Sequence, residues 1–264
     1  MKQLIIIITF TVALGYANAQ ERLFFDTPCE SVTTDIQGNV FLTQDFNLNM
    51  FSADGTKQLN YGEPTYGNIA KVDAGIASKI LVFYRERGII TLLNNELSPI
   101  GNPLSLYDKS LMTVSLAAMG NPNKIVLYDE SNQDLLITDL SLNTLSQTHI
   151  TFPGEFHPTD MQVVPEHRIA LLDTLHGICL FDFFGTFERE IPIPDIQRMQ
   201  LMKDRIIYLR DGRLWRYDLP SSISPMNLQP IDLDIPNAID FHIGKDALYY
   251  IDNQHIVKKI PMEM

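Results

Sequence analysis

Positive charge is scarce in this chain. Twenty Lys and Arg residues stand against 32 Asp and Glu residues, so the formal net charge is −12. An acidic surface without charge clusters argues against nucleic acid and anionic membranes as partners. It favours solubility and partners that are basic or cationic. No Asn-x-Ser/Thr sequon occurs either, which is compatible with a bacterial envelope protein.

Motifs of catalysis are also missing. The chain has no Gly-x-Ser-x-Gly elbow for a serine nucleophile and no glycine-rich loop that would hold a phosphate. Its six histidines show neither His-x-His nor His-x-x-x-His spacing, the spacings expected of metal ligands. We therefore expect no cofactor and favour a function other than catalysis.

Only one long apolar run occurs, and it lies at the N-terminus. Lys2 precedes the apolar stretch 4–14, and Ala17 and Ala19 supply the small residues of a cleavage site before Gln20. This pattern predicts a signal peptide over residues 1–19 rather than a membrane anchor. Because Gln20 stands where a lipidated cysteine would be needed, we expect neither a membrane span nor a lipid anchor. The localisation predicted is periplasmic or secreted.

Residues 20–264 repeat a strand pattern about every 40 residues, six times in all. Two units show it most clearly, residues 31–56 and residues 160–186. A repeat of this length indicates stacked units that bury their apolar faces against one another. Six such units use the whole length, so we expect a single domain that is all-β, a six-bladed β-propeller.

The second strand of each unit is the most legible element. Each version is a nearly continuous apolar run that ends in a polar residue, as expected for a strand buried on both faces. The six runs are residues 39–45, 79–85, 124–129, 168–173, 205–211 and 247–252. Fourth strands such as residues 144–150 and 187–193 are more polar, which predicts an exposed outer rim.

The ends of the chain predict how the ring closes. The last unit stops after its third strand at residues 255–260, while residues 22–26 read as a strand that precedes the first unit. Pairing of these two segments would complete the last blade and remove an exposed edge. Cys29 and Cys179 fall in the first and fourth units, too far apart for a disulfide. We expect both to be buried free thiols.

Two units resemble the NHL-type repeat of six-bladed propellers, which has an Asp-x-x-Gly-Asn turn, an apolar strand and an Ile-x-x-Phe-x-x-x-Gly strand. The matching residues are Asp35, Gly38, Asn39, Asp45, Phe51 and Gly55 in one unit, and Asp173, Ile178, Phe181 and Gly185 in the other. The chain is also similar to uncharacterised six-bladed propellers of bacterial envelopes. The resemblance implies the fold, but propellers serve as enzymes, ligand binders and scaffolds alike.

Resemblance to propellers of the gluconolactonase and paraoxonase families would imply a divalent cation in the central tunnel. Such a cation requires several converging oxygen ligands. The candidate ligands are Glu30, Asn68, Asp160, Asn237 and Asp240. Against this stand the third unit, whose inner strand (residues 113–119) has no carboxylate or amide, and the fifth (198–202), which offers only Gln200.

Aromatic and ionisable residues in the connectors are candidates for binding. Tyr61, Tyr66 and Tyr107 lie between units, where they either contact a partner or pack across neighbouring blades. Glu155 and His157 form a pair near the mouth of the tunnel, with acid–base chemistry and a plain connector loop as the alternatives.

These observations favour an exported, non-enzymatic propeller that binds a protein partner or serves as a scaffold in the bacterial cell envelope. An outer-membrane assembly or secretion complex is one such setting. We expect the chain to be monomeric by itself. The alternative is a metal-dependent hydrolase of the lactonase or esterase type.

Overall fold

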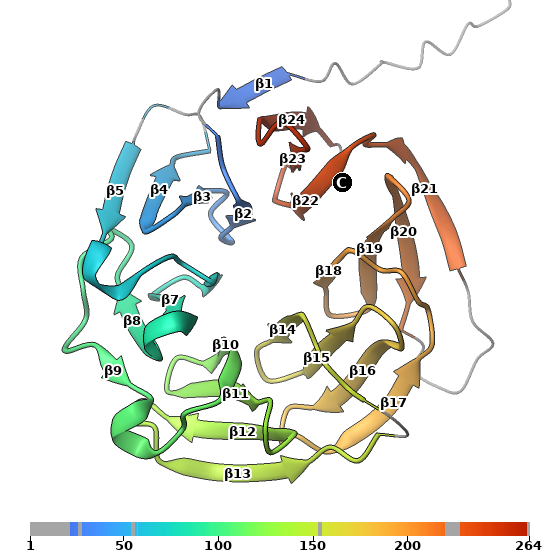
Figure 1. Ribbon diagram of the computed structural model, residues 1–264. Coiled ribbons are helices and arrows are strands. Elements are labelled where there is room, and N and C mark those ends of the chain that lie inside the picture. The colour runs from blue at the N-terminus through green and yellow to red at the C-terminus, as the bar shows by residue number, and fades with distance from the viewer. Residues whose placement is uncertain are drawn as a thin grey trace, which may run out of the picture.

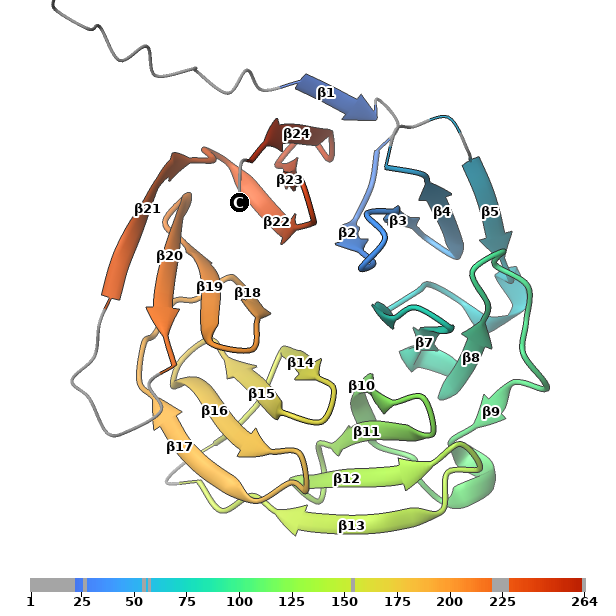
Figure 2. The ribbon, with the colours of Figure 1, turned by 180° about the vertical axis from the view of Figure 1, so that it is seen from behind.

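Six four-stranded antiparallel sheets form a ring in the computed structural model, which describes residues 22–25, 28–53, 56, 58–152, 155–219 and 228–262 (Figure 1). The same ring is seen from behind in Figure 2. The arrangement confirms the predicted six-bladed β-propeller. The predicted signal peptide, residues 1–19, lies outside the described residues, so the predicted boundary of the domain at residue 20 stays a prediction. Within the described ranges, no helix is long and apolar enough to cross a membrane.

Each of the first five blades is a meander of four consecutive strands, running from the centre to the rim. Blade 1 contains β2 (Ser31–Thr34), β3 (Val40–Gln44), β4 (Asn47–Phe51) and β5 (Gln58–Gly62). Blade 2 contains β6 (Lys71–Ile76), β7 (Lys79–Tyr84), β8 (Ile89–Leu93) and β9 (Leu104–Ser105). Blade 3 contains β10 (Val114–Asn121), β11 (Lys124–Asp129), β12 (Asp134–Asp139) and β13 (Thr144–His149). Blade 4 contains β14 (Asp160–Val164), β15 (Arg168–Asp173), β16 (Gly177–Asp182) and β17 (Phe187–Ile191). Blade 5 contains β18 (Arg198–Leu201), β19 (Arg205–Arg210), β20 (Arg213–Asp218) and β21 (Leu228–Asp234).

Blade 6 is built from both ends of the chain. It combines β22 (Ala238–Ile243), β23 (Ala247–Asp252) and β24 (Val257–Pro261) with β1 (Arg22–Phe25) as its outer strand. The strands β1 and β24 are antiparallel, with Arg22 opposite Lys259 and Phe25 opposite Val257. The predicted closure of the last blade by the N-terminal strand is therefore confirmed. It gives β24 a hydrogen-bonded neighbour at the rim of the sheet.

The hydrophobic core is divided into six clusters, one between each pair of neighbouring blades. The second strands supply most of it, as their apolar runs predict; in β15, for example, every residue from Ile169 to Asp173 is buried. The cluster between the last and first blades contains Val40 and Tyr249, so the ring closes by side-chain packing as well as by strand pairing. The outer strands β13 and β17 are mostly exposed or half-buried.

Tight turns join the strands, and Gly177 shows why one of them needs glycine. This residue opens β16 with φ of +107°, and a Cβ there would lie 2.2 Å from the carbonyl oxygen of Ile191. Short 3₁₀ helices occupy three connectors: η1 (Pro64–Tyr66), η2 (Arg85–Arg87) and η3 (Tyr107–Lys109). Cys29 and Cys179 are buried free thiols, as predicted.

Candidate functional site: the central channel

The innermost strands surround a central cavity of about 680 Å³, here called the channel. Register places the side chains of its wall in two rings, because equivalent inner-strand residues pair with equivalent positions of each blade's second strand. The first ring comprises Ser31, Lys71, Leu116, Asp160, Arg198 and Asp240. The second ring comprises Thr33, Asp73, Ala118, Gln162, Gln200 and His242. Both rings are polar except at blade 3, and none of the described residues that line the channel comes from β10.

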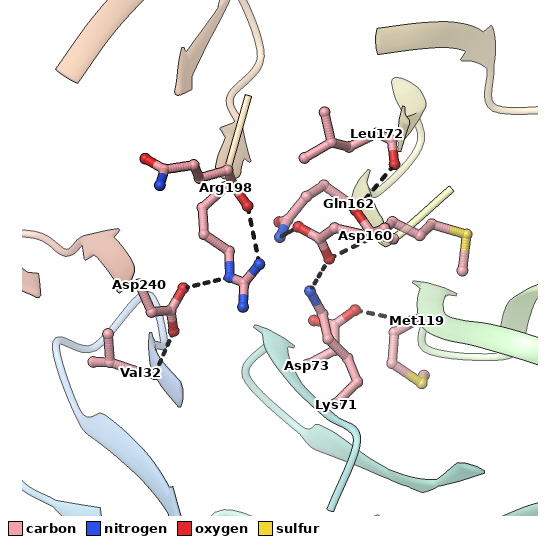
Figure 3. Close-up of polar contacts among 12 residues, drawn as sticks. Val32, Lys71, Asp73, Met119, Asp160, Gln162, Leu172, Arg198 and Asp240 are labelled. Carbon is pink, nitrogen blue, oxygen red and sulfur yellow. Dashed lines mark hydrogen bonds and ion pairs between the residues drawn. The ribbon is translucent and has the colours of Figure 1, made fainter. Parts of the chain in front are cut away.

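Two ion pairs span the first ring, as Figure 3 shows. Lys71 Nζ donates to Asp160 Oδ1 at 2.6 Å and so connects blade 2 to blade 4 across the face of blade 3. Arg198 Nε lies 3.4 Å from Asp240 Oδ1. The second oxygen of Asp240 accepts the Val32 amide proton at 2.9 Å, which joins blade 6 to blade 1.

The second ring connects the remaining inner strands through backbone hydrogen bonds. Asp73 Oδ2 accepts from the Met119 amide at 2.9 Å, which ties blade 2 to blade 3. Gln200 accepts from the Ile243 amide at 2.8 Å and donates to the Ile243 carbonyl at 2.9 Å. Inner strands have one unpaired edge, which faces the channel and would leave amides unsatisfied. The polar side chains of the wall satisfy several of them.

His242 is held as a neutral ring by this network. Its Nε2 lies 3.4 Å from Gln200 Nε2, and the bonds of Gln200 to Ile243 fix that nitrogen as a donor. Nε2 of His242 therefore accepts, and the proton is on Nδ1, which lies 3.0 Å from Thr34 Oγ1. Burial lowers the pKa of His242 to about 4, and the nearby Lys71 charge lowers it further.

Burial dominates the electrostatics of the channel carboxyls. It raises the pKa of Asp240 to about 6, against the opposing effects of Arg198 and the Val32 amide. Burial likewise raises the pKa of Asp73, although the amides of Gly75 and Met119 act in the other direction. Burial alone would lower the pKa of Lys71, but the Asp160 carboxylate raises it above its ordinary value. The wall is therefore a set of paired charges rather than a free acid cluster.

The five candidate ligands for a cation are not gathered at one place. Asp160 and Asp240 line the channel, whereas Glu30, Asn68 and Asn237 are exposed and do not. The two carboxylates that do reach the channel already pair with Lys71 and Arg198. Within the described ranges, no group of three or more His, Cys, Asp or Glu side chains could hold a metal ion. This donor set does not suit a divalent cation, which requires several converging oxygens.

The predicted binding tyrosines lie in connectors and outer strands. Tyr61 on β5 and Tyr66 on η1 are half-buried and pack on the core cluster between blades 1 and 2, where Tyr66 makes an edge contact with Tyr84. This is the packing role that the sequence left open for them. Tyr107 on η3 is 42% exposed, and its hydroxyl donates to the Glu86 carbonyl at 3.3 Å.

Glu155 and His157 lie in the connector that leads into β14. His157 Nε2 is 3.8 Å from Glu155 Oε2, and its Nδ1 is 3.3 Å from Glu130 Oε1. Both side chains are mostly exposed, and the His157 amide donates to Asp173. Neither residue lines the channel. Their use in binding stays a prediction.

Lys71, Asp73, Arg198 and His242 are the channel residues that the sequence analysis missed. A signal for them exists in the repeat: four inner strands show two polar residues separated by one, in the pairs Lys71 and Asp73, Asp160 and Gln162, Arg198 and Gln200, and Asp240 and His242. Two polar residues on one face of an otherwise buried inner strand indicate a wall that faces solvent or a ligand.

Comparison by sequence finds no match, either to a family model or to a curated protein. Comparison of structures finds other propellers. The WD40 domain of Neurospora crassa Pan2 is 11% identical, with 90% of each chain covered and a TM-score of 0.62. RRP9 WD40 repeats are 9% identical over 94% of this chain and 98% of theirs, with a TM-score of 0.62. Virginiamycin B lyase from Staphylococcus aureus is 15% identical over 92% of this chain and 99% of its own, with a TM-score of 0.59. At these identities, the likeness establishes the β-propeller fold of this chain and nothing further.

Proposed function

We propose that this chain is an exported β-propeller that binds another protein and catalyses no reaction itself. The setting proposed is the bacterial cell envelope, in the periplasm or outside the cell, as the NHL-type resemblance and the N-terminal sequence suggest. An assembly or secretion complex at the outer membrane is one place for such a scaffold.

An apolar patch on the rim is the observation that most favours protein binding. It consists of Leu145 on β13 together with Phe184 and Phe187 of blade 4, and it is called the rim patch here. The three side chains are 56%, 70% and 52% exposed. Ser146, the neighbour of Leu145, donates to the Phe184 carbonyl at 3.2 Å, so the outer edges of blades 3 and 4 meet at this patch.

Folding does not explain this exposure. Phe187 contacts the buried Phe181 with its ring centroid 5.7 Å away, yet about half of its surface remains in water. Aromatic side chains exposed together are typical of protein-binding surfaces, where they provide rigid contact area. Because the chain has a net charge of −12, we propose a partner that presents an apolar surface among basic residues.

The channel supports a role other than catalysis. Asp160 and Asp240 pair with the chain's own cations, and Asp73 accepts two backbone amides. His242 is neutral and bonded at both ring nitrogens. Nucleophilic or acid–base catalysis needs a group that is free to react and a base beside it, and these residues are occupied in joining blades.

Selective loss of a partner tests the proposal. The double variant Phe184→Ser/Phe187→Ser removes the aromatic part of the rim patch. Leu175→Ser is the matched control, because Leu175 is 76% exposed and precedes β16, whereas Phe184 follows it. A partner captured from the native host should bind the wild type and the Leu175→Ser variant equally, and the double variant about tenfold more weakly or worse. Equal binding of the purified partner to all three proteins would refute a role for the rim patch.

Export is tested separately by the N-terminus of the secreted product. The expected mature protein begins at Gln20 and appears in the periplasmic or extracellular fraction, and Ala19→Arg should leave the precursor uncut. Recovery of the uncut wild-type chain from the cytosol would contradict export and leave the rim patch untouched.

A further inference from the structure

A second, smaller cavity of about 40 Å³ lies beside the channel, against blade 3. Lys71, Arg85, Thr159 and Asp160 line both cavities, so the Lys71–Asp160 ion pair lies at the boundary between them. The rest of its wall is mainly apolar and includes Phe83, Leu116, Ala117 and Met161. This volume admits a carboxylate group, or about one or two water molecules.

Arg85 brings a cation without a partner to this boundary. It begins η2 at the end of β7 and is exposed. No described residue forms an ion pair or a side-chain hydrogen bond with its guanidinium, although both other cations of the wall, Lys71 and Arg198, are paired. Because a guanidinium offers a planar fork of donors, it matches a carboxylate in two parallel hydrogen bonds.

Ser115 places an unsatisfied donor in the same small cavity. The residue is 8% exposed, and its Oγ finds no hydrogen-bond partner among the described residues. It lines the small cavity together with Arg85 and Lys71. Buried hydroxyls normally have a partner, and leaving one without a partner costs free energy. An acceptor supplied by a ligand would satisfy it.

The charges at this place select the kind of ligand. Lys71 and Arg85 contribute two positive charges and Asp160 one negative charge, which leaves an excess of one cation. A monoanion neutralises that excess, whereas a dianion such as phosphate would meet the Asp160 carboxylate with a charge to spare. The apolar part of the wall suits a short aliphatic chain next to the anionic group. The larger channel has room for a longer ligand.

We propose that the junction of the two cavities is a binding site for a small monocarboxylate. The carboxylate group lies between the Arg85 guanidinium, the Ser115 hydroxyl and the Lys71 ammonium, and the rest of the ligand extends along Leu116 and Met161 or into the channel. This site is distinct from the rim patch, and it does not depend on the proposed protein partner.

The test is saturation-transfer NMR of the mature protein with propionate, compared with propionamide and inorganic phosphate at equal ionic strength. Propionate should give saturation transfer and a saturable titration, while propionamide and phosphate should bind at least about tenfold more weakly. Absence of propionate binding to the wild type, or equal binding of propionamide, would overturn the proposal and indicate that the small cavity holds water only.

Variants then place the ligand. Arg85→Gln should weaken propionate binding about tenfold or more, since a hydrogen-bonded charge pair is lost, and Ser115→Ala should weaken it to a smaller extent. Arg87→Gln is the matched control: Arg87 is exposed, belongs to the same η2 and lines neither cavity. Equal effects of Arg85→Gln and Arg87→Gln would contradict the site. Thermal unfolding of each variant without ligand confirms that it is folded.

Discussion

The Nζ atom of Lys71 lies 2.6 Å from Oδ1 of Asp160, and this ion pair joins blade 2 to blade 4 without involving the blade between them. Side chains of the two residues are 28% and 13% exposed, so solvent screens the pair only in part. In front of blade 3 it replaces the direct contacts that Leu116 and Ala118 cannot make. The channel wall therefore links non-neighbouring blades, in addition to the core clusters that link neighbouring ones.

Replacing Asp240 by Asn should change how stability depends on pH. The folded protein keeps the Asp240 proton up to about pH 6, whereas the unfolded chain loses it near the ordinary value of 3.8. Between these values the folded state binds more protons, so this group's contribution to the free energy of unfolding falls as pH rises, by up to about 3 kcal/mol.

Comparison with the variant is needed because His242 acts in the opposite direction. Its lowered pKa of about 4 makes the folded state bind fewer protons between pH 4 and 6.5, which raises stability with pH. Urea unfolding of both proteins from pH 4 to 7 should show Asp240→Asn gaining stability relative to the wild type as pH rises. A difference that stays constant, as expected for the exposed control Asp108→Asn, would contradict the buried carboxyl.

The sequence predicted the strands and the closure of the ring because these follow from local patterns. Continuous apolar runs such as residues 168–173 could only be second strands buried on both faces, and the missing fourth strand of the last unit indicated the role of Arg22–Phe25. Period and alternation are properties of neighbouring residues, and they survive without a structure.

The channel was predicted only in part, because its contacts join residues that are distant in the chain. Asp160 and Asp240 were singled out as oxygen ligands, yet their partners Lys71 and Arg198 were not. Lys71 and Asp160 are 89 positions apart, and their encounter depends on the curvature of the whole ring. Tyr66 shows the same limit: its contact with Tyr84 depends on how two blades stack.

Gly177→Ala should destabilise the protein by about 2 kcal/mol or more, because a Cβ would clash with fixed backbone and φ is +107°. The midpoint of chemical unfolding measures the loss. Gly101→Ala serves as control, since Gly101 also has positive φ (+75°) but no atom within 4 Å of the added Cβ. It should cost about 1 kcal/mol. Equal losses for the two variants would contradict the close approach to Ile191.

Both cysteines should resist thiol reagents in the folded protein. Burial, with a smaller effect of Glu30, raises the pKa of Cys29 to about 11, and burial together with Glu190 raises that of Cys179 to about 12. Thiolate is the reactive form, so alkylation at pH 8 should require unfolding. Leu175→Cys, at a position that is 76% exposed in the wild type, should react at once. Rapid native labelling of Cys29 or Cys179 would show that the blades they pack between are open.

Removing β1 should destabilise blade 6. A chain beginning at Pro28 lacks the strand that pairs with Lys259 and Val257, and the lost ladder is worth on the order of 2–4 kcal/mol. A chain beginning at Gln20 is the control, since it keeps β1. Thermal unfolding should occur at a clearly lower temperature for the shorter chain. The same midpoint for both would mean that pairing of the two termini does not stabilise the ring.

The coupling energy between Lys71 and Asp160, obtained from a double-mutant cycle of Lys71→Met and Asp160→Asn by urea unfolding at pH 7, addresses the channel wall most directly. If this pair ties blade 2 to blade 4, the double variant should lose less stability than the two single variants together, with a coupling of about 1 kcal/mol or more. Strictly additive losses would contradict the account, because they would show that the two charges contribute to the ring independently of each other.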